Sequence, residues 1–554
     1  MGDPSRDDAA FNQSPPFVDV NLFTSDRSLC ETVAREGGGW AAEDLEVFGG
    51  VTGSATAIEL GRLANAHPPE LQSFDAGGRR IDHVEFHPAY HEIMAISMAQ
   101  GLHCSTWQHL LNDAPPQAGA HVARAAGFYL AAQMEPGHCC PITMTHASVA
   151  ALGHAPALAA EWLPRILACT YDPATSPASL KSAVTLGMGM TERQGGTDVR
   201  ANTTRAEPLG AGDGAYAITG HKWFLSAPMS DAFLVLAQAK EGLTCFLLPR
   251  LTPEGELNGI ELVRLKGKLG NRSNASAEVE FTNATGFLVG EAGRGVPAII
   301  DMVTLTRLDC AVSSSGLMRQ AVARAIHHAR HRSVFQKRLI DQPLMIRVLA
   351  DMALDVEAAM ALSFRLARAF DGGTDEIEVA YRRVMTPVTK YWVCKTAPNV
   401  VYEAMECLGG NGYVEEGGFP LLYREVPVNA IWEGSGNVMG LDVLRVLERS
   451  PETVRSVLEG IDVLGRGEPR IQAALDRIET CLAEAMRDQS VARTLVEALA
   501  LAQAGALLLA HAPQEVSDAF LATRLTGTGR STYGAGVGKI DARSLVDRAA
   551  PSLV

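Results

Sequence analysis

The spacing of apolar residues divides the chain into regions of different structure. From residue 17 to about 182, Ala-rich stretches such as HVARAAGFYLAAQM carry apolar residues three and four positions apart, which is the spacing of packed helices. From 183 to 295 the apolar residues come in short β-type runs such as AFLVLAQA, separated by Gly, Asn, Pro and Asp. These runs predict a small antiparallel barrel or sandwich. The helical spacing returns over 296–449 and predicts a bundle.

The two ends of the chain depart from this pattern. The first residues are polar and contain prolines, and the last hundred are Ala- and Leu-rich and end in a Gly-, Thr- and Ser-rich tail. The stretch YDPATSPASLKS breaks the first helical region with two prolines, so we expect a boundary there. The predicted class is α+β, with a loose N-terminus (1–16), a helical domain (17–182), a β domain (183–295), a helical bundle (296–449) and a C-terminal helical extension (450–554).

Composition limits the classes of protein to which the chain can belong. At 554 residues the chain is too long for one hydrophobic core, and 47% apolar with 20% charged residues is typical of a folded protein. The formal net charge of −15 argues against sequence-independent coating of DNA. The acidic start is unlike a signal peptide, and no apolar stretch looks long enough to span a bilayer, so we expect a cytoplasmic protein with no membrane partner.

The cysteines and histidines do not suggest a metal site. Ten scattered cysteines without a C-x-x-C pair predict reduced thiols rather than a disulfide framework or a zinc ribbon. The stretch HEIMA, from His91, lacks the second histidine of a zinc protease. The stretch GAGVGK (534–539) lacks the first Gly of a phosphate-binding loop and the Ser or Thr that follows its Lys.

The stretch IWEGSGN (431–437) holds a candidate acid or base. Glu433 stands between the indole of Trp432 and a flexible Gly-Ser-Gly run, a place where a carboxylate can be desolvated and aimed. In the alternative interpretation, Glu433 caps a helix that begins near Asn437 and Trp432 is part of the core. These seven residues alone leave both interpretations open.

Three further segments can contact a flat, polar ligand. GMGMTERQGGTDV (187–199) is a turn whose small residues expose backbone N–H groups, and it is not the G-x-G-x-x-G fingerprint. In GHKWFLSAP (220–228), strand alternation places Phe224 and Ser226 on one face. In ECLGGNGY (406–413), Gly409 and Gly410 allow a ligand to approach the backbone. Each also has a structural alternative: an ordinary turn, a half-buried strand and a helix C-cap.

These segments, in this order and on this succession of domains, resemble the acyl-CoA dehydrogenase flavoproteins. ELGRLANAHPPEL, PITMTHA, KLGNRSNAS and the helical extension are most similar to the AidB-like branch of that family. The resemblance implies a helical N-terminal domain, a middle antiparallel β-barrel and a C-terminal bundle. It also implies FAD as cofactor, an acyl-CoA substrate, a homotetramer, and an electron-transfer flavoprotein or another electron acceptor.

The resemblance also implies roles for individual residues. Glu433 corresponds to the base that abstracts the α-proton of the thioester while the flavin accepts hydride. Ser226 replaces the usual Thr, Gln336 a Gly, and Glu406 a Gln. The implied cofactor-binding residues are Met190, Thr191, Thr197, Phe224, Leu225, Ser226, Arg332, Phe335, Gly409, Gly410, Trp432, Ser435 and Asn437.

Two functions of different class follow. The first is an acyl-CoA dehydrogenase, which the intact Glu433 favours. The second is a DNA-associated flavoprotein of the alkylation response with a weak or vestigial dehydrogenase site. Only the tail is basic, so double-stranded DNA would have to bind a stripe of tail residues together with one from the bundle. The candidate DNA contacts are Arg445, Arg524, Arg530, Lys539, Arg543 and Arg548.

Overall fold

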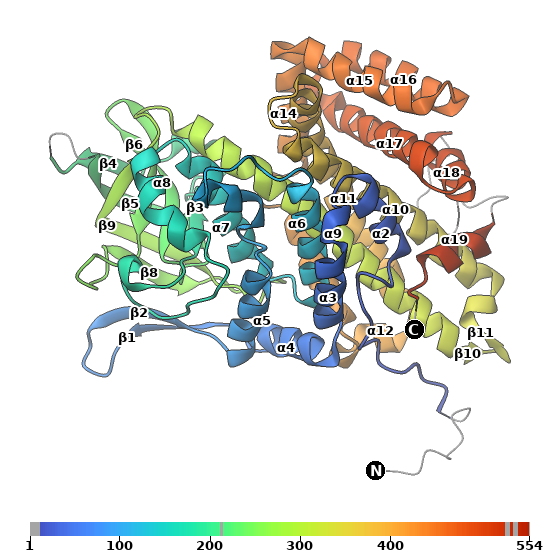
Figure 1. The fold of residues 1–554 in the computed structure, drawn as a ribbon, viewed down its shortest axis with the longest axis horizontal. Helices are drawn as coiled ribbons and strands as arrows, with labels where there is room; N and C mark the ends of the chain where they lie inside the picture. The colour runs from blue at the N-terminus through green and yellow to red at the C-terminus, as the bar shows by residue number, and fades with distance from the viewer. Residues whose placement is uncertain (1–10, 211–213, 527–531, 534, 536–540, 553–554) are drawn as a thin grey trace. The chain divides into compact units, whose positions relative to one another are not determined.

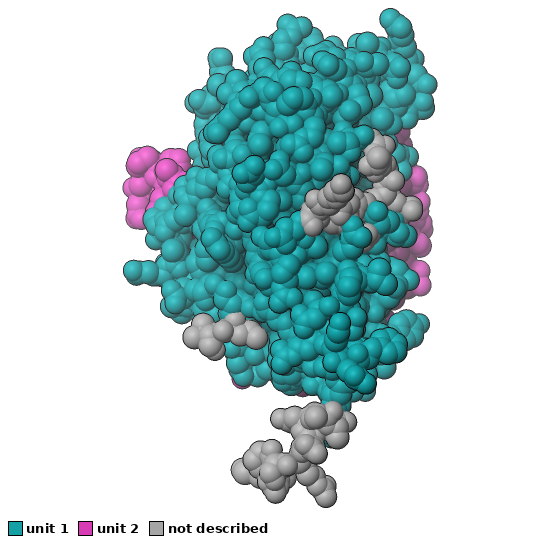
Figure 2. Space-filling model, turned by 90° about the vertical axis from the view of Figure 1, so that its right-hand side faces the viewer, with its two compact units in different colours: residues 1–55, 121–133, 310–554 teal, residues 56–120, 134–309 magenta. Residues whose placement is uncertain are grey.

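A computed structural model describes residues 11–210, 214–526, 532–533, 535 and 541–552 (Figure 1). The chain divides into two compact units, coloured separately in Figure 2. The first comprises residues 1–55, 121–133 and 310–554, and the second comprises 56–120 and 134–309. Residues 17–182, predicted as one domain, therefore contribute to both units.

A seven-stranded sheet is the centre of the second unit. Its order is β3-β5-β4-β6-β7-β9-β8, and an additional β5–β9 pairing closes five of the strands into a ring. Most pairs are antiparallel, as predicted, but β3 and β4 both pair with β6 in parallel. In the sequence, β5 lies between these strands and β6 and runs antiparallel to both β3 and β4, so the chain reverses before it enters β6. The strands are β3 (Leu186–Gly189), β4 (Arg205–Pro208), β5 (Ala215–Ser226), β6 (Ala232–Ala239), β7 (Gly242–Pro249), β8 (Ile260–Leu265) and β9 (Ser276–Val289).

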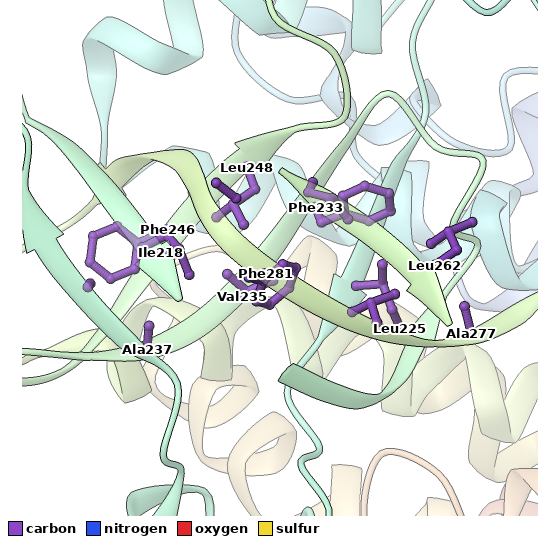
Figure 3. Close-up of a cluster of buried hydrophobic side chains, with 14 of the residues drawn as sticks. Ile218, Leu225, Phe233, Val235, Ala237, Phe246, Leu248, Leu262, Ala277 and Phe281 are labelled. Carbon is purple, nitrogen blue, oxygen red and sulfur yellow. The ribbon is translucent and has the colours of Figure 1, made fainter. Parts of the chain in front are cut away.

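The interior of this barrel is apolar (Figure 3). Phe233, Val235 and Ala237 alternate along β6 and point into the cluster, as the period of two residues in a strand requires. Leu225 of β5 lies beside Ala277 of β9 in the same cluster. The barrel core therefore fixes the strand that carries the predicted flavin contacts.

A β-hairpin in the second unit was not predicted. β1 (Glu70–Phe74) and β2 (Arg80–Glu85) pair within a region whose spacing suggested only helices. Asp75 Oδ1 accepts hydrogen bonds from the backbone N–H groups of Gly77 and Arg79, and this Asx-type turn reverses the chain. The other elements of this unit are α4 (Ala55–Ala66), α5 (Pro88–Ala99), the 3₁₀ helix η2 (Ser105–Leu111), α7 (Cys139–Leu152) and α8 (Pro156–Ile166).

The first unit is a helical bundle. Leu349, Met352, Val356 and Met360 are buried on one face of α10, as their spacing predicted. The bundle helices are α2 (Arg27–Arg35), α3 (Ala42–Thr52), α6 (Ala120–Met134), α9 (Gly295–His331), α10 (Pro343–Asp371), α11 (Glu376–Cys407), α12 (Gly410–Tyr413), α13 (Phe419–Asn429) and α14 (Gly436–Arg449). The part of α9 before Cys310 belongs to the second unit. The extension adds α15 (Pro451–Gly465), α16 (Pro469–Ala485), α17 (Ala492–His511), α18 (Gln514–Phe520) and α19 (Ala542–Ala549).

Two expectations about this unit need correction. Residues 12–15 were expected to be loose, but Asn12 Nδ2 donates to Ser333 O (2.8 Å) and Pro15 O lies 2.9 Å from His327 Nε2. The segment Gln489–His511 is long and apolar enough to cross a membrane by length and composition, contrary to our sequence estimate. Because 61% of its apolar window is buried inside the protein, it also fits the core helix of a folded bundle.

Candidate active site

Glu433 lies in a tight turn between α13 and α14. Its backbone is left-handed, with φ of +56°, and Gly434 follows at +103°. A non-glycine residue seldom adopts this conformation, because its Cβ crowds the backbone. Such a backbone costs about 1–3 kcal/mol and persists only where the surrounding structure imposes it. The N-cap of α14 is Ser435, so Glu433 is not the capping residue of the alternative interpretation.

Lys390 of α11 holds this turn. Its ammonium group donates to Trp432 O (2.7 Å) and to Gly434 O (2.6 Å), the carbonyls on either side of Glu433. Lys390 is 1% exposed. A buried ammonium group is stable only where hydrogen bonds compensate for its lost hydration, and both carbonyls serve that purpose. Sequence reasoning missed Lys390, although a lysine on an apolar helix face is a usable signal.

The indole of Trp432 is fixed by a second set of contacts. Trp432 Nε1 donates to Asn429 Oδ1 (2.9 Å), and the amide nitrogen of Asn429 donates to Ser314 Oγ (3.0 Å) on α9. Asn429 and Ser314 are buried. The aromatic ring beside Glu433 is therefore anchored to two helices, α9 and α13, and its orientation does not depend on a ligand.

The second unit brings the predicted flavin-contacting segments together on adjacent strands. Met188 of β3 pairs with Ser226 of β5, and Trp223 N donates to Thr191 O (2.8 Å). The half-buried Thr191, two residues after β3, thus lies beside β5, which carries the half-buried Ser226 and the 44% exposed Phe224. Met190 is fixed next to Thr191 through its carbonyl, which accepts from Asn202 Nδ2 (3.0 Å).

Glycines in the first of these segments allow the close approach of its backbone. A Cβ on Gly187 would stand 2.6 Å from Ser226 O, and one on Gly196 would stand 2.3 Å from Thr191 Oγ1. Any larger residue would push the two strands, or the turn and Thr191, apart. The turn continues to the exposed Thr197, so the glycines here serve packing as well as ligand access.

A buried ion pair fixes the turn after Thr191. Lys222 Nζ donates to Glu192 Oε1 (2.8 Å) and to Leu236 O (2.7 Å). Glu192 also accepts from Thr203 N at 2.6 Å. Burial alone would raise the pKa of Glu192, but the Lys222 ammonium and these hydrogen bonds hold that pKa well below its usual range. The sequence analysis did not single out this pair.

Strict alternation along β5 was only partly correct. Alternation predicts Trp223 and Leu225 on one face and Phe224 and Ser226 on the other, but Leu225 lies fully in the barrel core whereas Trp223 is only half-buried. The ladder between β5 and β9 shifts register between Lys222 and Leu225. This β-bulge in β5 interrupts the alternation of its side chains. The side chain of Leu225, which we expected to contact the cofactor, faces the core, so only its backbone is available to a ligand.

Arg332 and Phe335 lie on a small exposed hairpin of the first unit. β10 (Ser333–Val334) and β11 (Lys337–Arg338) are joined by two left-handed residues, Phe335 (φ +51°) and Gln336 (φ +65°). Glycine adopts this left-handed conformation readily, which explains why other members of the resembled family carry Gly where this chain has Gln336. Phe335 is 91% exposed, and Arg332 donates to Asn12 O within the same chain.

The remaining residues of the first unit that were predicted to contact the cofactor are exposed, but they differ in how available they are to a ligand. Gly409 (φ +61°, ψ −139°) adopts a conformation that is open only to glycine, and a Cβ on Gly409 or Gly410 would meet nothing within 4 Å. Ser435 is exposed at the start of α14. Asn437 is less available than predicted, because its Oδ1 already accepts from Arg493 Nε (2.8 Å) of α17.

The candidate DNA contacts do not form the predicted set. The side chain of Arg524 is 5% exposed and pairs with Asp351 and Asp355. That of Arg548 is 8% exposed and pairs with Glu357 and Glu31. Both are internal cross-links rather than surface cations. Arg445 and Arg543 are about half exposed, and each has an acidic partner. The other two candidates, Arg530 and Lys539, lie outside the described residues.

Comparison with known proteins identifies the family. Residues 12–173 match the adaptive response protein AidB N-terminal domain, 187–284 the acyl-CoA dehydrogenase middle domain and 293–448 the acyl-CoA dehydrogenase C-terminal domain. AidB of Escherichia coli (strain K12) is 48% identical over 94% of both chains. The chain belongs to the AidB branch of the acyl-CoA dehydrogenase family.

Two further comparisons come from Caenorhabditis elegans. Acyl-CoA dehydrogenase family member 11 is 31% identical over 90% of this chain and 84% of its own length. The crystal structure of ACDH-11 in complex with C11-CoA matches with a TM-score of 0.85 at 28% identity, covering 99% of this chain and 97% of that one. The acyl-CoA dehydrogenase fold therefore includes the extension after residue 450.

The site residues fit the FAD that the family uses. A flavin presents a flat ring with a polar edge, and the second unit offers the exposed Phe224 ring and the Ser226 hydroxyl on β5 and the Thr191 hydroxyl just after β3. A diphosphate can approach the backbone closely at Gly409 and Gly410 of the first unit, where even a Cβ would meet nothing within 4 Å, although the Gly409 N–H already donates to Glu406 O (2.9 Å). Glu406, the departure that would repel a diphosphate, is exposed on α11, where water can screen its charge.

Proposed function

We propose that this chain is an FAD-dependent acyl-CoA dehydrogenase in which Glu433 takes the α-proton of an acyl-CoA thioester. The observation that carries this proposal is the left-handed backbone of Glu433, imposed by a buried lysine that binds the carbonyls on both sides. A residue kept only as a helix cap would have no need of such a conformation. Strain of this kind is characteristic of positions at which a side chain must be aimed.

The chain's own residues contribute position and a proton acceptor. Glu433 accepts the proton on a carboxylate oxygen, and the anchored indole of Trp432 limits the access of water to that carboxylate. Lys390 keeps the turn in one conformation through the reaction. Bound FAD supplies the acceptor for the hydride that leaves the β-carbon. Thr191 and Ser226 would hydrogen-bond the polar edge of the flavin, and Phe224 would pack against its ring.

The comparison with the C11-CoA complex supports a fatty acyl-CoA as the substrate class. We further propose an electron-transfer flavoprotein, or another acceptor of similar function, as the oxidant that restores the flavin. A cytoplasmic location is also proposed, and the ten free cysteines support a reducing compartment.

An anaerobic titration tests the main proposal. The purified yellow protein is mixed with a panel of straight and branched acyl-CoAs, and the loss of the yellow flavin absorbance is followed as an indicator of reduction. Bleaching by at least one thioester is expected, with the matching free acid as the control. If no thioester bleaches a fully flavinated protein, the dehydrogenase proposal is wrong.

A homotetramer with shared cofactor sites is proposed from the exposed hairpin. A phenylalanine that is 91% exposed at the tip of a strained turn is unfavourable in water unless another surface covers it. We expect Phe335→Ala to lower FAD retention by about tenfold, equivalent to the loss of one aromatic contact. Flavin content after gel filtration measures this, with Leu344→Ala, another exposed apolar residue, as control. Full flavination of a monomer would contradict the proposal.

The alternative function, DNA binding, makes a different prediction for the arginines of the tail. Because Arg524 pairs with two buried carboxylates, Arg524→Ala should lower the free energy of unfolding by about 3 kcal/mol. The exposed Arg543→Ala should leave stability within about 0.5 kcal/mol. Thermal denaturation of both variants distinguishes them. A stable Arg524→Ala protein that loses salt-sensitive binding to duplex DNA would instead support the alternative.

A further inference from the structure

Two cysteines of the second unit face each other without being bonded. Cys104 directly precedes η2, and Cys169 follows α8. Their sulfur atoms are 3.5 Å apart. Cys104 is fully buried, whereas Cys169 is exposed to solvent. The pair thus combines a thiol that a small oxidant can reach with a second thiol in contact with it.

The two segments that carry these cysteines are docked by hydrogen bonds. Gln108 Nε2 donates to Leu167 O (2.7 Å), and His103 Nε2 lies 3.0 Å from Ala168 O. The same Gln108 nitrogen is 3.1 Å from the sulfur of Cys104 and 3.6 Å from that of Cys169. An N–H donor at this position stabilises a thiolate on either sulfur, and the thiolate is the reactive form of cysteine.

We propose that Cys104 and Cys169 form a reversible disulfide when Cys169 is oxidised by a hydroperoxide. The Cys169 thiolate attacks the peroxide oxygen, which breaks the O–O bond and leaves a sulfenic acid and an alcohol or water. The Cys104 thiol then attacks the Cys169 sulfur, forms the S–S bond and releases water. Both thiols are oxidised by one electron each, the peroxide is reduced by two, and a small thiol reductant reverses the change.

Cys30 in α2, one of two partly exposed cysteines, has a different environment. Burial, and then the nearby carboxylate of Asp26, raises the pKa of Cys30 to about 11, so its thiol stays protonated at neutral pH. Cys245 and Cys407 are buried, and burial raises the pKa of each to about 12. Compared with these three cysteines, Cys169 is more exposed and lies against a second thiol, which favours oxidation at the Cys104–Cys169 pair.

The cysteine pair is connected to the predicted flavin-contacting strand within the same unit. In η2, Thr106 Oγ1 lies 2.8 Å from His146 Nε2 and Trp107 Nε1 donates to His146 O (2.9 Å). The neighbouring Thr145 Oγ1 accepts from Leu186 N (3.0 Å), the first residue of β3. A disulfide between residues 104 and 169 would therefore restrain the helix that supports the strand leading to Thr191.

The test uses the flavinated full chain and hydrogen peroxide and requires no acyl-CoA turnover, so its failure is independent of the proposed function. After one equivalent of peroxide, mass spectrometry of non-reduced peptides should show one linked pair containing Cys104 and Cys169, with the loss of two hydrogens. Dithiothreitol should remove it. We also expect the oxidised protein to melt roughly 5 °C higher, because the bond closes a long loop.

Substitutions distinguish the role of Cys169, which is oxidised first, from that of Cys104, which then forms the disulfide. Cys104→Ser should accumulate a dimedone adduct at Cys169, because the sulfenic acid has no thiol to attack it, and Cys169→Ser should give no adduct at Cys104. Gln108→Leu should slow disulfide formation about tenfold, as expected for losing a hydrogen bond to a charged group. Cys30→Ser serves as the control and should behave like the wild type. Absence of both the linked peptide and the Cys169 adduct would overturn the proposal.

Discussion

The Glu433→Gln protein is expected to bind FAD and acyl-CoA but to lose reduction of the flavin by acyl-CoA. Glutamine is nearly isosteric with glutamate and can keep the left-handed backbone, since neither side chain is β-branched. A neutral amide cannot accept the α-proton, however. Removal of a general base typically slows a reaction by a factor of about 10² to 10⁴, and by more where water cannot replace it.

Stopped-flow absorbance under anaerobic conditions measures the rate, and a melting curve on the same sample measures the fold. Glu376→Gln is the matched control, because it makes the same chemical change at an exposed carboxylate of α11 and should reduce at the wild-type rate. Glu433→Gly adds a second comparison: it removes the carboxylate and relieves the backbone strain, so it should be inactive but at least as stable as the wild type. Reduction by Glu433→Gln within a few-fold of wild type would show that the carboxylate is not the base.

The sequence predicted the parts of this fold that depend on local periodicity. The runs that became β6 and β7 are short, apolar and bounded by turn residues, and the buried face of α10 follows from three- and four-residue spacing. Alternation placed Phe224 and Ser226 on the opposite face of their strand from Trp223 and Leu225. It failed at Trp223 because a register shift between β5 and β9 interrupts the alternation, and a bulge leaves no signal in one strand's sequence.

The parts that the sequence did not predict depend on contacts between distant residues. Arg524 and Arg548 read as a basic tail, yet their carboxylate partners are 169 and 191 positions away, on α10. The hydrogen bonds from Lys390 to the Glu433 turn span more than 40 residues. For the same reason Glu433 could be recognised as a candidate base by resemblance, whereas its left-handed backbone and the lysine that imposes it required the structure.

The largest structural effect is expected at Lys390. Lys390→Met keeps the length of the side chain and its apolar stem but removes the donor shared by Trp432 O and Gly434 O. A buried carbonyl that loses its partner costs about 1–3 kcal/mol, so we expect the free energy of unfolding to fall by about 3 kcal/mol. The turn would no longer be held with Glu433 aimed in one direction. Because a displacement of about 1 Å can cost 10²-fold in rate, flavin reduction should slow by roughly that factor.

Positioning and stability can be told apart in the Lys390→Met protein. At a temperature where it is fully folded and flavinated, titration with a non-reducible acyl-CoA analogue should give nearly the wild-type dissociation constant, while stopped-flow reduction remains slow. Lys395→Met, one turn further along α11 and beside the ring of Tyr391, is the control and should alter neither quantity by more than about twofold. In the Glu433→Gly background, Lys390→Met should have no further effect on reduction, because Lys390 acts only through Glu433. Wild-type reduction by a folded Lys390→Met protein would mean that the backbone of this turn keeps its conformation without the lysine, and that the strain at Glu433 has another cause.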